Sequence, residues 1–261
     1  MIQNADKILF RASAMSLIMK DGRAKNSGMG ETGKSYCKKL FMELMYDRHE
    51  EVTTKQMERG KISEESGITL YSLHTKTFFK KNEQNITNLF FSGTPDIFRG
   101  EDILHAEEGA DIKCPWSLFT LPFPSDELDD CYYFQNMTYC ALTGAKKWST
   151  VYTLVNLPAS QLDDEKRRWQ YKLNVLDPDT DPVYIEKCKE LEKLYIVDMA
   201  QFQKDYGWYD FATDLNDWKY DIPREKRIVT FEVARDENVI RQMEARVIEA
   251  RIYIQNHLID K

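Results

Sequence analysis

The sequence predicts a mixed α/β fold, because segments with helical periodicity alternate with β-branched segments along its length. In residues 1–80 apolar positions recur with helical spacing, and β-rich stretches follow in the centre of the chain. A β-branched run and a strongly amphipathic segment then close the sequence. The order helices, strands, helix, strand, helix favours a sheet flanked by helices.

The individual elements follow from these patterns. Helices are expected at 5–20, 34–49, 53–77, 127–144, 183–194 and 236–258. Strands are expected at 88–98, 110–116, 148–156 and 226–234. The fourth of these helices ends at Gly144, a residue suited to the left-handed backbone of a helix C-cap. Residues 158–221 are charged and rich in Tyr and Trp, and we expect them to form a separate, largely helical segment.

Composition and charge narrow the class of protein. The chain has 261 residues, 42% hydrophobic and 30% charged, as in a soluble globular protein. No window approaches the roughly 18 apolar residues of a membrane span, and the first residues lack the layout of a signal peptide. We therefore expect a cytoplasmic protein with no membrane partner. The net charge of −7 argues against a basic nucleic-acid coat protein, but not against a nuclease with a local basic groove.

The cysteines indicate reduced thiols rather than a cross-linked or metal-bound scaffold. Their odd number, five, argues against a closed disulfide framework. They form no C-x-x-C pair and lack the clustered spacing of a zinc or iron–sulfur site.

The most conspicuous motif is "GMGETGKS" at 28–35, which satisfies the phosphate-binding pattern G-x-x-x-x-G-K-[ST]. A working loop of this kind lies between a buried strand and a helix, so that backbone N–H groups meet the phosphates. Here the preceding residues "KDGRAKNS" are polar and turn-like, and no apolar run ending in Asp follows to hold magnesium. We therefore interpret 28–35 as a connection between two helices, and we do not expect ATP as a ligand.

Three residues of the central strands carry the strongest chemical signal. Asp96 and Asp111 are 15 positions apart, and Lys113 follows Asp111 by two. On a strand, a spacing of two places Asp111 and Lys113 on one face. If Asp96 lies on a neighbouring strand, the carboxylates converge, and their repulsion invites Mg²⁺ or Mn²⁺. A lysine beside that metal could steer or deprotonate a water that attacks a phosphodiester. An Asp-x-Lys pair alone is more typical of a surface ion pair.

Two helical residues add to this constellation. Glu64 shares a helical face with the apolar Ile68 and Tyr71, where a carboxylate is unusual unless a metal compensates for its burial. Gly60, one turn before Glu64, would let this helix approach the sheet closely. In the later helix, Gln135 lies on an inward face. Each residue alone is more typical of a satisfied core polar group, and the informative feature is the order Glu, Asp, Asp-x-Lys, Gln.

Several short segments of the chain match the motifs of one nuclease family. "GKISE" is similar to G-K-x-x-E, "TPDIF" to S-P-D-G-[LI], and "DIKCPW" to E-L-K-C-P-F, where the C-P-aromatic end is the most specific piece. "RASAMSLIM", "SYCKKLFMEL", "YYFQNMTYCALTG" and "FEVARDE" are similar to further family segments. In these motifs the chain resembles the PD-(D/E)xK nucleases, and among them the lambda-type (YqaJ-like) viral recombination exonucleases.

The resemblance implies a restriction-endonuclease-like core with a central mixed sheet flanked by helices, plus a largely helical insertion. It describes one nuclease domain, with N-terminal helices (1–80), a catalytic sheet and helix (81–157), the insertion (158–222) and a final strand and helix (223–261). It also implies a Mg²⁺-dependent 5′→3′ exonuclease, with Mn²⁺ as a second ion, that acts on duplex DNA ends. Such proteins form a ring-shaped homotrimer and feed single strands to an annealing partner, in the host cytoplasm if phage-encoded.

Carried over by position, the resemblance assigns roles to individual residues. The catalytic residues would be Glu64, Asp96, Asp111, Lys113 and Gln135. The metal ligands would be Asp96, Asp111 and the Ile112 carbonyl, with Glu64 assisting. Lys113 would handle the water, and Gln135 would orient the lysine or the water. The hydroxyl side chains that grip the 5′-phosphate map to Ser13 and Thr94, and we add Arg11 as a further candidate.

The chain also departs from the family. The W-x-x-x-R segment that precedes the first family helix has no match, so its 5′-phosphate arginine cannot be carried over. Residues 158–222 align with no family segment. Three other readings stay open: an endonuclease or CRISPR-adaptation-like nuclease of the same fold without an iron–sulfur cluster, a catalytically silent DNA-binding protein, and an ATPase that uses 28–35.

Overall fold

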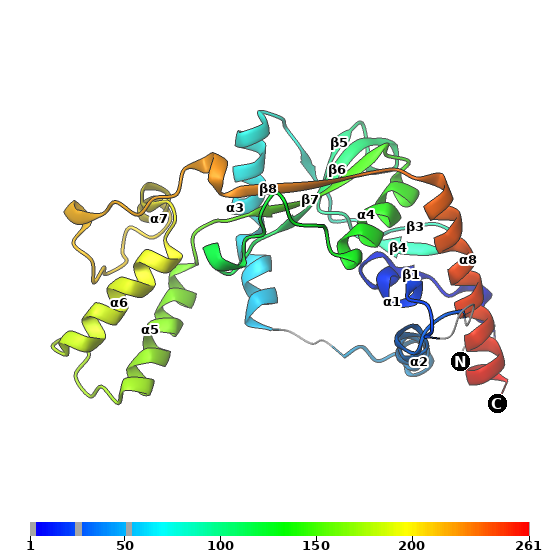
Figure 1. The fold of residues 1–261 in the computed structure, drawn as a ribbon, viewed down its shortest axis with the longest axis horizontal. Coiled ribbons are helices and arrows are strands. Elements are labelled where there is room, and N and C mark those ends of the chain that lie inside the picture. Colours follow the sequence, from blue (N-terminus) through cyan, green and yellow to red (C-terminus); the bar gives the residue numbers. More distant parts are fainter. Residues whose placement is uncertain (1–3, 24–27, 51–53, 261) are drawn as a thin grey trace.

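The computed structural model describes residues 4–23, 28–50 and 54–260, and it shows the mixed α/β fold that the sequence predicts (Figure 1). The helices are α1 (Met15–Met19), α2 (Glu31–Tyr46), α3 (Lys55–Thr75), α4 (Asp130–Thr143), α5 (Ala159–Leu173), α6 (Pro182–Tyr195), α7 (Met199–Asp205) and α8 (Glu237–Ile254). The strands are β1 (Phe10–Arg11), β2 (Lys80–Lys81), β3 (Ile86–Thr87), β4 (Phe91–Gly93), β5 (Ile97–Gly100), β6 (Ala106–Lys113), β7 (Lys147–Thr153) and β8 (Ile228–Ala234). In these described ranges, no helix combines the length and apolar character that crossing a bilayer requires.

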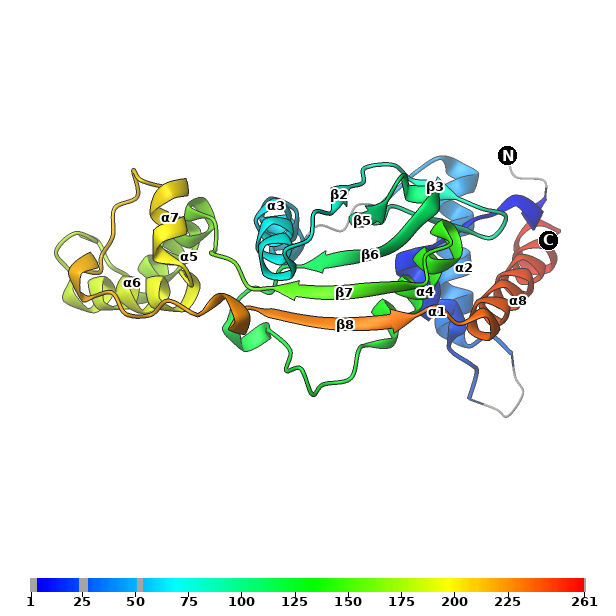
Figure 2. The same cartoon turned by 90° about the horizontal axis from the view of Figure 1, so that it is seen from above.

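The centre of the fold is a five-stranded sheet with the order β2-β5-β6-β7-β8. β6 and β7 are parallel, and the other neighbouring pairs are antiparallel. A parallel pair needs a crossover connection, which α4 supplies between β6 and β7. Figure 2 shows β6 and β7 running side by side toward α3, with β8 running in the opposite direction. The C-terminal ends of β6 and β7 therefore lie against α3.

The main hydrophobic core lies between this sheet, α4 and the terminal elements. Trp148 on β7, Met137 on α4 and Val247 on α8 belong to it, and all three are inaccessible to solvent. A second, three-stranded sheet with the order β1-β4-β3 joins the N-terminal segment to this core. In it, Phe10 pairs with Phe91 in parallel register, and both rings are fully buried.

The N-terminal segment differs from the expectation. The helix predicted at 5–20 is wrong, because only its last part, α1, is α-helical. Phe10 instead lies in a short strand, where pairing with β4 buries its ring and satisfies the backbone. The single strand predicted at 88–98 is also wrong, since it is divided into β4 and β5. Pro95 lies at the break, where its missing N–H cannot contribute to a strand ladder.

Residues 158–222, the helical insertion, have a hydrophobic core of their own. Ile196 and Phe202 are fully inaccessible within it. The carboxylate of Glu192 is also fully buried, where it lies 2.7 Å from Lys166 Nζ and accepts hydrogen bonds from backbone N–H groups after α7. These contacts connect α5 and α6 to Ala212 and Thr213, which lie outside the regular helices and strands. Figure 1 shows the insertion at the end of the molecule opposite α8.

One glycine sets how closely α3 approaches the sheet. At Gly67 an added Cβ would lie 2.5 Å from Thr153 Oγ1 and 2.9 Å from Ile112 Cγ2, closer than van der Waals contact allows. At Gly60 an added Cβ would have no neighbour within 4 Å. The expectation that Gly60 permits the close approach is therefore wrong, and Gly67, two turns later, has this role.

Alanine substitutions at the two glycines test this packing. Gly67→Ala should lower the free energy of unfolding by about 1–3 kcal/mol, because the methyl group must displace the helix or its neighbours. Gly60→Ala should raise it by up to about 1 kcal/mol, because alanine favours the helix and the methyl group meets nothing. Urea-induced unfolding followed by circular dichroism measures both changes. Equal effects of the two substitutions would contradict this account.

Candidate active site

Two carboxylates meet beside the pairing of β5 with β6. Asp96 immediately precedes β5, and Asp111 lies in β6, which pairs with β5 so that Ile97 faces Ala110. The Oδ2 atom of Asp96 accepts a hydrogen bond of 2.7 Å from the backbone N–H of Ile112. This bond fixes the first carboxylate against the strand that carries the second. Asp111 is only 2% exposed. The structure thus brings together the two acids singled out from the sequence.

Lys113 is the cation of this cluster. Its ammonium forms an ion pair with Asp111 Oδ2 and lies 5.2 Å from the centre of the Tyr132 ring. Burial lowers the pKa of Lys113, but the attraction of Asp111 and its hydrogen bond outweigh this effect, so the pKa lies above its ordinary value. Lys113 is therefore a firmly protonated partner of Asp111.

The unfavourable electrostatics of this arrangement appear in the pKa of Asp96. Its burial, together with the negative charge of Asp111, raises the pKa of Asp96 to about 7. The Ile112 N–H and the charge of Lys113 act in the opposite direction with smaller effects. A carboxyl group with such a pKa is well suited to exchange its proton for a metal cation near neutral pH.

Gln135 connects the carboxylates to a neighbouring cavity. From the inward face of α4, its Nε2 donates hydrogen bonds to Asp111 Oδ1 at 3.3 Å and to the Tyr139 hydroxyl at 2.9 Å. The Tyr139 hydroxyl in turn donates to the carbonyl of Thr94 at 3.4 Å. Both α4 side chains are buried. This relay orients Asp111 and ties it to the segment that leads into β5.

Glu64 lies at the edge of the cluster rather than at its centre. Its side chain on α3 is 29% exposed, and its Oε1 atom is 3.3 Å from Lys81 Nζ. Its charge makes the smallest contribution to the raised pKa of Asp96. In the described part of the chain, no three His, Cys, Asp or Glu side chains lie close enough together to hold a metal by themselves. The third carboxylate expected from the sequence is thus engaged by a lysine.

The donor set nevertheless fits a hard divalent cation. Mg²⁺ favours oxygen ligands, and it usually takes one or two carboxylates, with water and substrate phosphate oxygens at the other positions. Asp96 and Asp111 are two such carboxylates on adjacent paired segments. Their mutual repulsion is the kind of unfavourable charge that a cation relieves.

The three residues expected to contact a 5′-phosphate line one cavity of about 440 Å³ (the Arg11 cavity): Arg11, Ser13 and Thr94. Tyr139 forms a further part of its wall, so the relay from Asp111 ends at this cavity. Nη2 of Arg11 is held at 2.6 Å by Oε2 of the buried Glu43. The arginine side chain is 46% exposed, which leaves guanidinium surface open to a ligand.

The segment 28–35 leads from the N-terminal region into α2, which agrees with its interpretation as a connection. The N–H of Met29 donates to Glu249 Oε1 at 2.6 Å, so a carboxylate of α8 occupies this amide. Lys34 lies in the first turn of α2, 2.8 Å from Glu31. Within the segment, Met29 forms an isolated antiparallel β-bridge with Asp21. This geometry differs from the strand–loop–helix arrangement of a P-loop.

Sequence reasoning assigned no role to three residues of the site: Lys81, Tyr132 and Tyr139. A signal existed for the tyrosines, because both share a helical face with Gln135. Lys81 gave no such signal, since the pair Lys80–Lys81 is indistinguishable from a solvated surface pair. Only the pairing of β2 with β5 places it beside Glu64.

Comparison with known proteins relates this fold to exonucleases. No family model and no curated protein matches the sequence. The fold is similar to that of a phage-related exonuclease from Haemophilus somnus 129PT, with a TM-score of 0.66 and 19% identity over 97% of this chain and 96% of that chain. It is also similar to the alkaline exonuclease LHK-Exo from Laribacter hongkongensis (TM-score 0.57, 15% identity, 98% and 92% coverage). LHK-Exo in complex with dAMP matches with a TM-score of 0.56, 15% identity and coverage of 98% and 91%.

The chain therefore has the fold of these exonucleases, with the mixed sheet and flanking helices expected from the sequence. Since the similarity covers nearly all of each chain, it is not confined to the sheet and α4. Residues 158–222, for which sequence motifs offered no counterpart, fall within its span.

The raised pKa of Asp96 predicts that the cluster destabilises the folded protein, and that this destabilisation increases with pH. Between the ordinary pKa of 3.8 and about 7, the folded state retains a proton that the unfolded state has released, so stability falls as pH rises. Asp96→Asn removes the charge and keeps an acceptor for the Ile112 N–H. It should raise the free energy of unfolding by about 1–2 kcal/mol at pH 8, and by much less at pH 4. Urea unfolding in the presence of EDTA measures this, and an equal gain at both pH values would contradict it.

Proposed function

We propose that this protein is a Mg²⁺-dependent deoxyribonuclease, an exonuclease that degrades linear duplex DNA from its ends. The observation that carries the proposal is the cluster of Asp96, Asp111 and Lys113 beside the β5–β6 pairing. The likeness in fold to solved exonucleases supports it. Mn²⁺ is the alternative ion, because it accepts the same oxygen ligands.

The side chains of Asp96 and Asp111 and the backbone carbonyl of Ile112 would hold the ion, and Glu64 would assist from α3. When bound, Mg²⁺ polarises the scissile phosphate and lowers the pKa of a water molecule. If Glu64 turned toward the ion, it would give up the contact of its Oε1 with Lys81 Nζ, which is 3.3 Å long. Lys81 would then remain paired with Glu65, with which it also forms an ion pair.

Lys113 would receive the proton of the attacking water. While Asp111 faces the ammonium alone, their ion pair keeps the lysine protonated. If the charge of Asp111 is shared with a divalent cation, it no longer offsets the effect of burial, which lowers the pKa of Lys113. Nζ could then release its proton to solvent and, as a neutral amine, accept a proton from the attacking water. Tyr132, whose ring centre is 5.2 Å from Nζ, limits the positions that the amine can take.

The Arg11 cavity would bind the terminal 5′-phosphate and so give digestion a 5′→3′ direction. A guanidinium and two hydroxyls are suitable donors to phosphate oxygens. Arg11 supplies the charge, while Ser13 and Thr94 supply the hydroxyls. Hydrogen bonds of Gln135 to Tyr139 and to Asp111 connect the cavity to the carboxylates. This connection would fix the distance between the bound 5′ end and the bond that is hydrolysed.

A 5′→3′ exonuclease leaves a single strand with a 3′ end, the form of DNA that strand annealing requires. We therefore extend the proposal to phage-type recombination in the host cytoplasm, with a single-strand annealing protein as partner. Assembly as a ring-shaped homotrimer around DNA is part of the same proposal. These three points rest on the resemblance of the sequence motifs.

Substitution of the cluster should abolish hydrolysis without unfolding the protein. Lys113→Met and Asp111→Asn should each slow the digestion of linear duplex DNA in Mg²⁺ by about 100- to 10,000-fold. EDTA should abolish the wild-type activity. Lys147→Met is a matched control, because Lys147 forms ion pairs with Glu108 and Glu232 elsewhere on the sheet. It should retain activity within about twofold, as expected for the loss of exposed ion pairs.

The same assays separate the alternatives. Wild-type rates in either cluster variant would contradict the proposal. Cleavage of covalently closed circular DNA would identify an endonuclease of the same fold. An inactive wild type that binds DNA, with no calorimetric signal for Mg²⁺ or Mn²⁺, would indicate a catalytically silent binding protein. ATP hydrolysis that Lys34→Ala eliminates would instead restore the ATPase interpretation.

The Arg11 cavity predicts a preference for phosphorylated 5′ ends. The wild type should digest a 5′-phosphorylated duplex faster than the unphosphorylated one. Arg11→Gln should reduce the ratio of the two rates about tenfold or more, because a hydrogen bond to a charged group contributes roughly 1.5–3 kcal/mol. Arg241→Gln is the control, since Arg241 is an exposed arginine of α8 outside the cavity. Equal rates on the two duplexes, or a preference for 3′ ends, would refute the proposed direction.

A further inference from the structure

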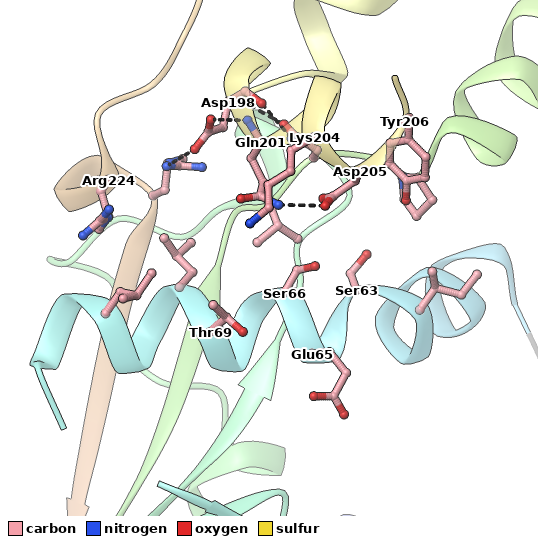
Figure 3. A pocket seen from close by; sticks show the side chains of 17 residues that line it. Ser63, Glu65, Ser66, Thr69, Asp198, Gln201, Lys204, Asp205, Tyr206 and Arg224 are labelled. Carbon is pink, nitrogen blue, oxygen red and sulfur yellow. Dashed lines mark hydrogen bonds and ion pairs between the residues drawn. The ribbon is translucent and has the colours of Figure 1, made fainter. Parts of the chain in front are cut away.

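A second pocket lies between α3 and the helical insertion (Figure 3). Its volume is about 330 Å³. We name it the α3–α7 pocket and define it by Ser63, Thr69, Lys204, Tyr206, Arg224 and Arg227. Within the described ranges, it shares no lining residue with the Arg11 cavity, and neither Asp96 nor Asp111 reaches it.

Two buried donors of this pocket are unsatisfied. Ser63 is 3% exposed and Arg227 is 7% exposed. Neither Ser63 Oγ nor Arg227 Nε has a hydrogen-bond partner in the described part of the chain. Figure 3 shows the Ser63 hydroxyl directed from α3 toward the insertion. Because buried donors are almost always paired, two unpaired donors in one pocket indicate a ligand with acceptor atoms.

The charges of the pocket favour an anion. Its basic residues are Lys204, Arg224 and Arg227, and its acidic residues are Glu65, Asp198 and Asp205. Each acid is already engaged. Glu65 pairs with Lys81 and points away from the pocket in Figure 3. Asp198 binds Arg227 Nη2 at 2.9 Å, and Asp205 accepts a hydrogen bond from Gln201 at 2.8 Å.

Two of the basic residues are free to meet a ligand. Among the described residues, neither Arg224 nor Lys204 forms an ion pair, and both residues are exposed. Arg227 has its Nη2 bound to Asp198, while its buried Nε has no partner in the described part of the chain. With Arg227 paired to Asp198 and Glu65 paired to Lys81, only Asp205 remains against Lys204 and Arg224. The pocket therefore keeps a small excess of positive charge, which would attract an anion.

The two ends of the pocket differ in chemistry. Figure 3 shows Arg224 at one end and Tyr206 at the other. Buried side chains of Leu70, Val155 and Pro158 contribute apolar surface to the pocket. The Tyr206 ring packs against that of Phe202, with their centres 5.0 Å apart, which holds the tyrosine in place. A guanidinium suits a phosphate, and a fixed aromatic ring suits a nucleobase.

We propose that the α3–α7 pocket binds a nucleoside monophosphate unit, with its phosphate at Arg224 and Arg227 and its base beside Tyr206. The unit is either a free mononucleotide or one nucleotide of a single strand, since both offer the same chemistry. The proposal does not rest on the proposed hydrolysis, because the pocket contains none of Asp96, Asp111 and Lys113.

Calorimetric titrations of the full chain in EDTA test this site without hydrolysis. Arg11→Gln serves as the background, because it disables the other phosphate cavity. dTMP should bind this protein, and adding Arg224→Gln should weaken binding at least tenfold. Lys226→Gln is the matched control, since it removes an exposed charge of the same segment that does not line the pocket. Ser63→Ala should weaken binding at least threefold while removing only one hydroxyl.

The source of the nucleotide follows from a second titrant. Tighter binding of oligo(dT) than of dTMP, lost with Arg224→Gln, identifies a strand as the ligand. Equal or weaker binding of oligo(dT) identifies the free nucleotide. Equal dTMP binding by the Arg224→Gln and Lys226→Gln proteins, or no binding of either titrant, would overturn the proposal. None of these results depends on whether the protein hydrolyses DNA.

Discussion

The forced proximity of Asp96 and Asp111 is the constraint on which the rest of the site depends. Burial of Asp96, together with repulsion from the negative charge of Asp111, raises the pKa of Asp96 to about 7. The fold maintains this unfavourable arrangement through groups of opposite polarity on the same strand. The N–H of Ile112 holds Asp96, and the ammonium of Lys113 holds Asp111. Strongly perturbed carboxyl groups are characteristic of sites that bind cations or transfer protons.

The topology determines which side chains can reach these carboxylates. Because β6 and β7 are parallel, the connection between them must cross over the sheet, and α4 makes that crossing. Its inward face therefore presents Gln135 to Asp111, while the neighbouring Asn136 donates to Thr150 Oγ1 at 2.9 Å and anchors the helix to β7. On the other side, Gly67 lets α3 reach the strand ends closely enough for Glu64 to influence Asp96.

Features set by local periodicity could be predicted from the sequence, whereas features set by tertiary pairing could not. Asp111 and Lys113 share a strand face, and Gln135 shares a helical face with tyrosines, so both follow from spacing alone. The strand at Phe10 was missed because its burial depends on Phe91, far along the chain. The pairing of Glu64 with Lys81 was missed for a similar reason, since β2 places that lysine. The phosphate contacts proposed for Ser13 and Thr94 rest only on the family resemblance.

The helix α3 links the carboxylate cluster to the helical insertion. Arg59 on this helix is 1% exposed, and it donates to the carbonyl of Val155, just beyond β7, at 2.9 Å. Its guanidinium also lies 5.6 Å from the centre of the Trp116 ring. Burial lowers the pKa of Arg59 to about 10, so holding this charge inside is unfavourable and needs strong compensation from its surroundings. Such an anchor fixes α3 to the strand ends.

Because α3 is fixed in this way, the residues on its different faces keep constant positions relative to one another. One side of α3 carries Glu64, which faces Lys81 and the carboxylates. The preceding residue, Ser63, lies about 100° around the helix axis and faces the insertion. A ligand that spans from Ser63 to Arg227 would add contacts between α3 and the segment before β8, and so restrain the helix further. The insertion would thereby help to hold α3, the helix that carries Glu64, without contributing any group to the cluster itself.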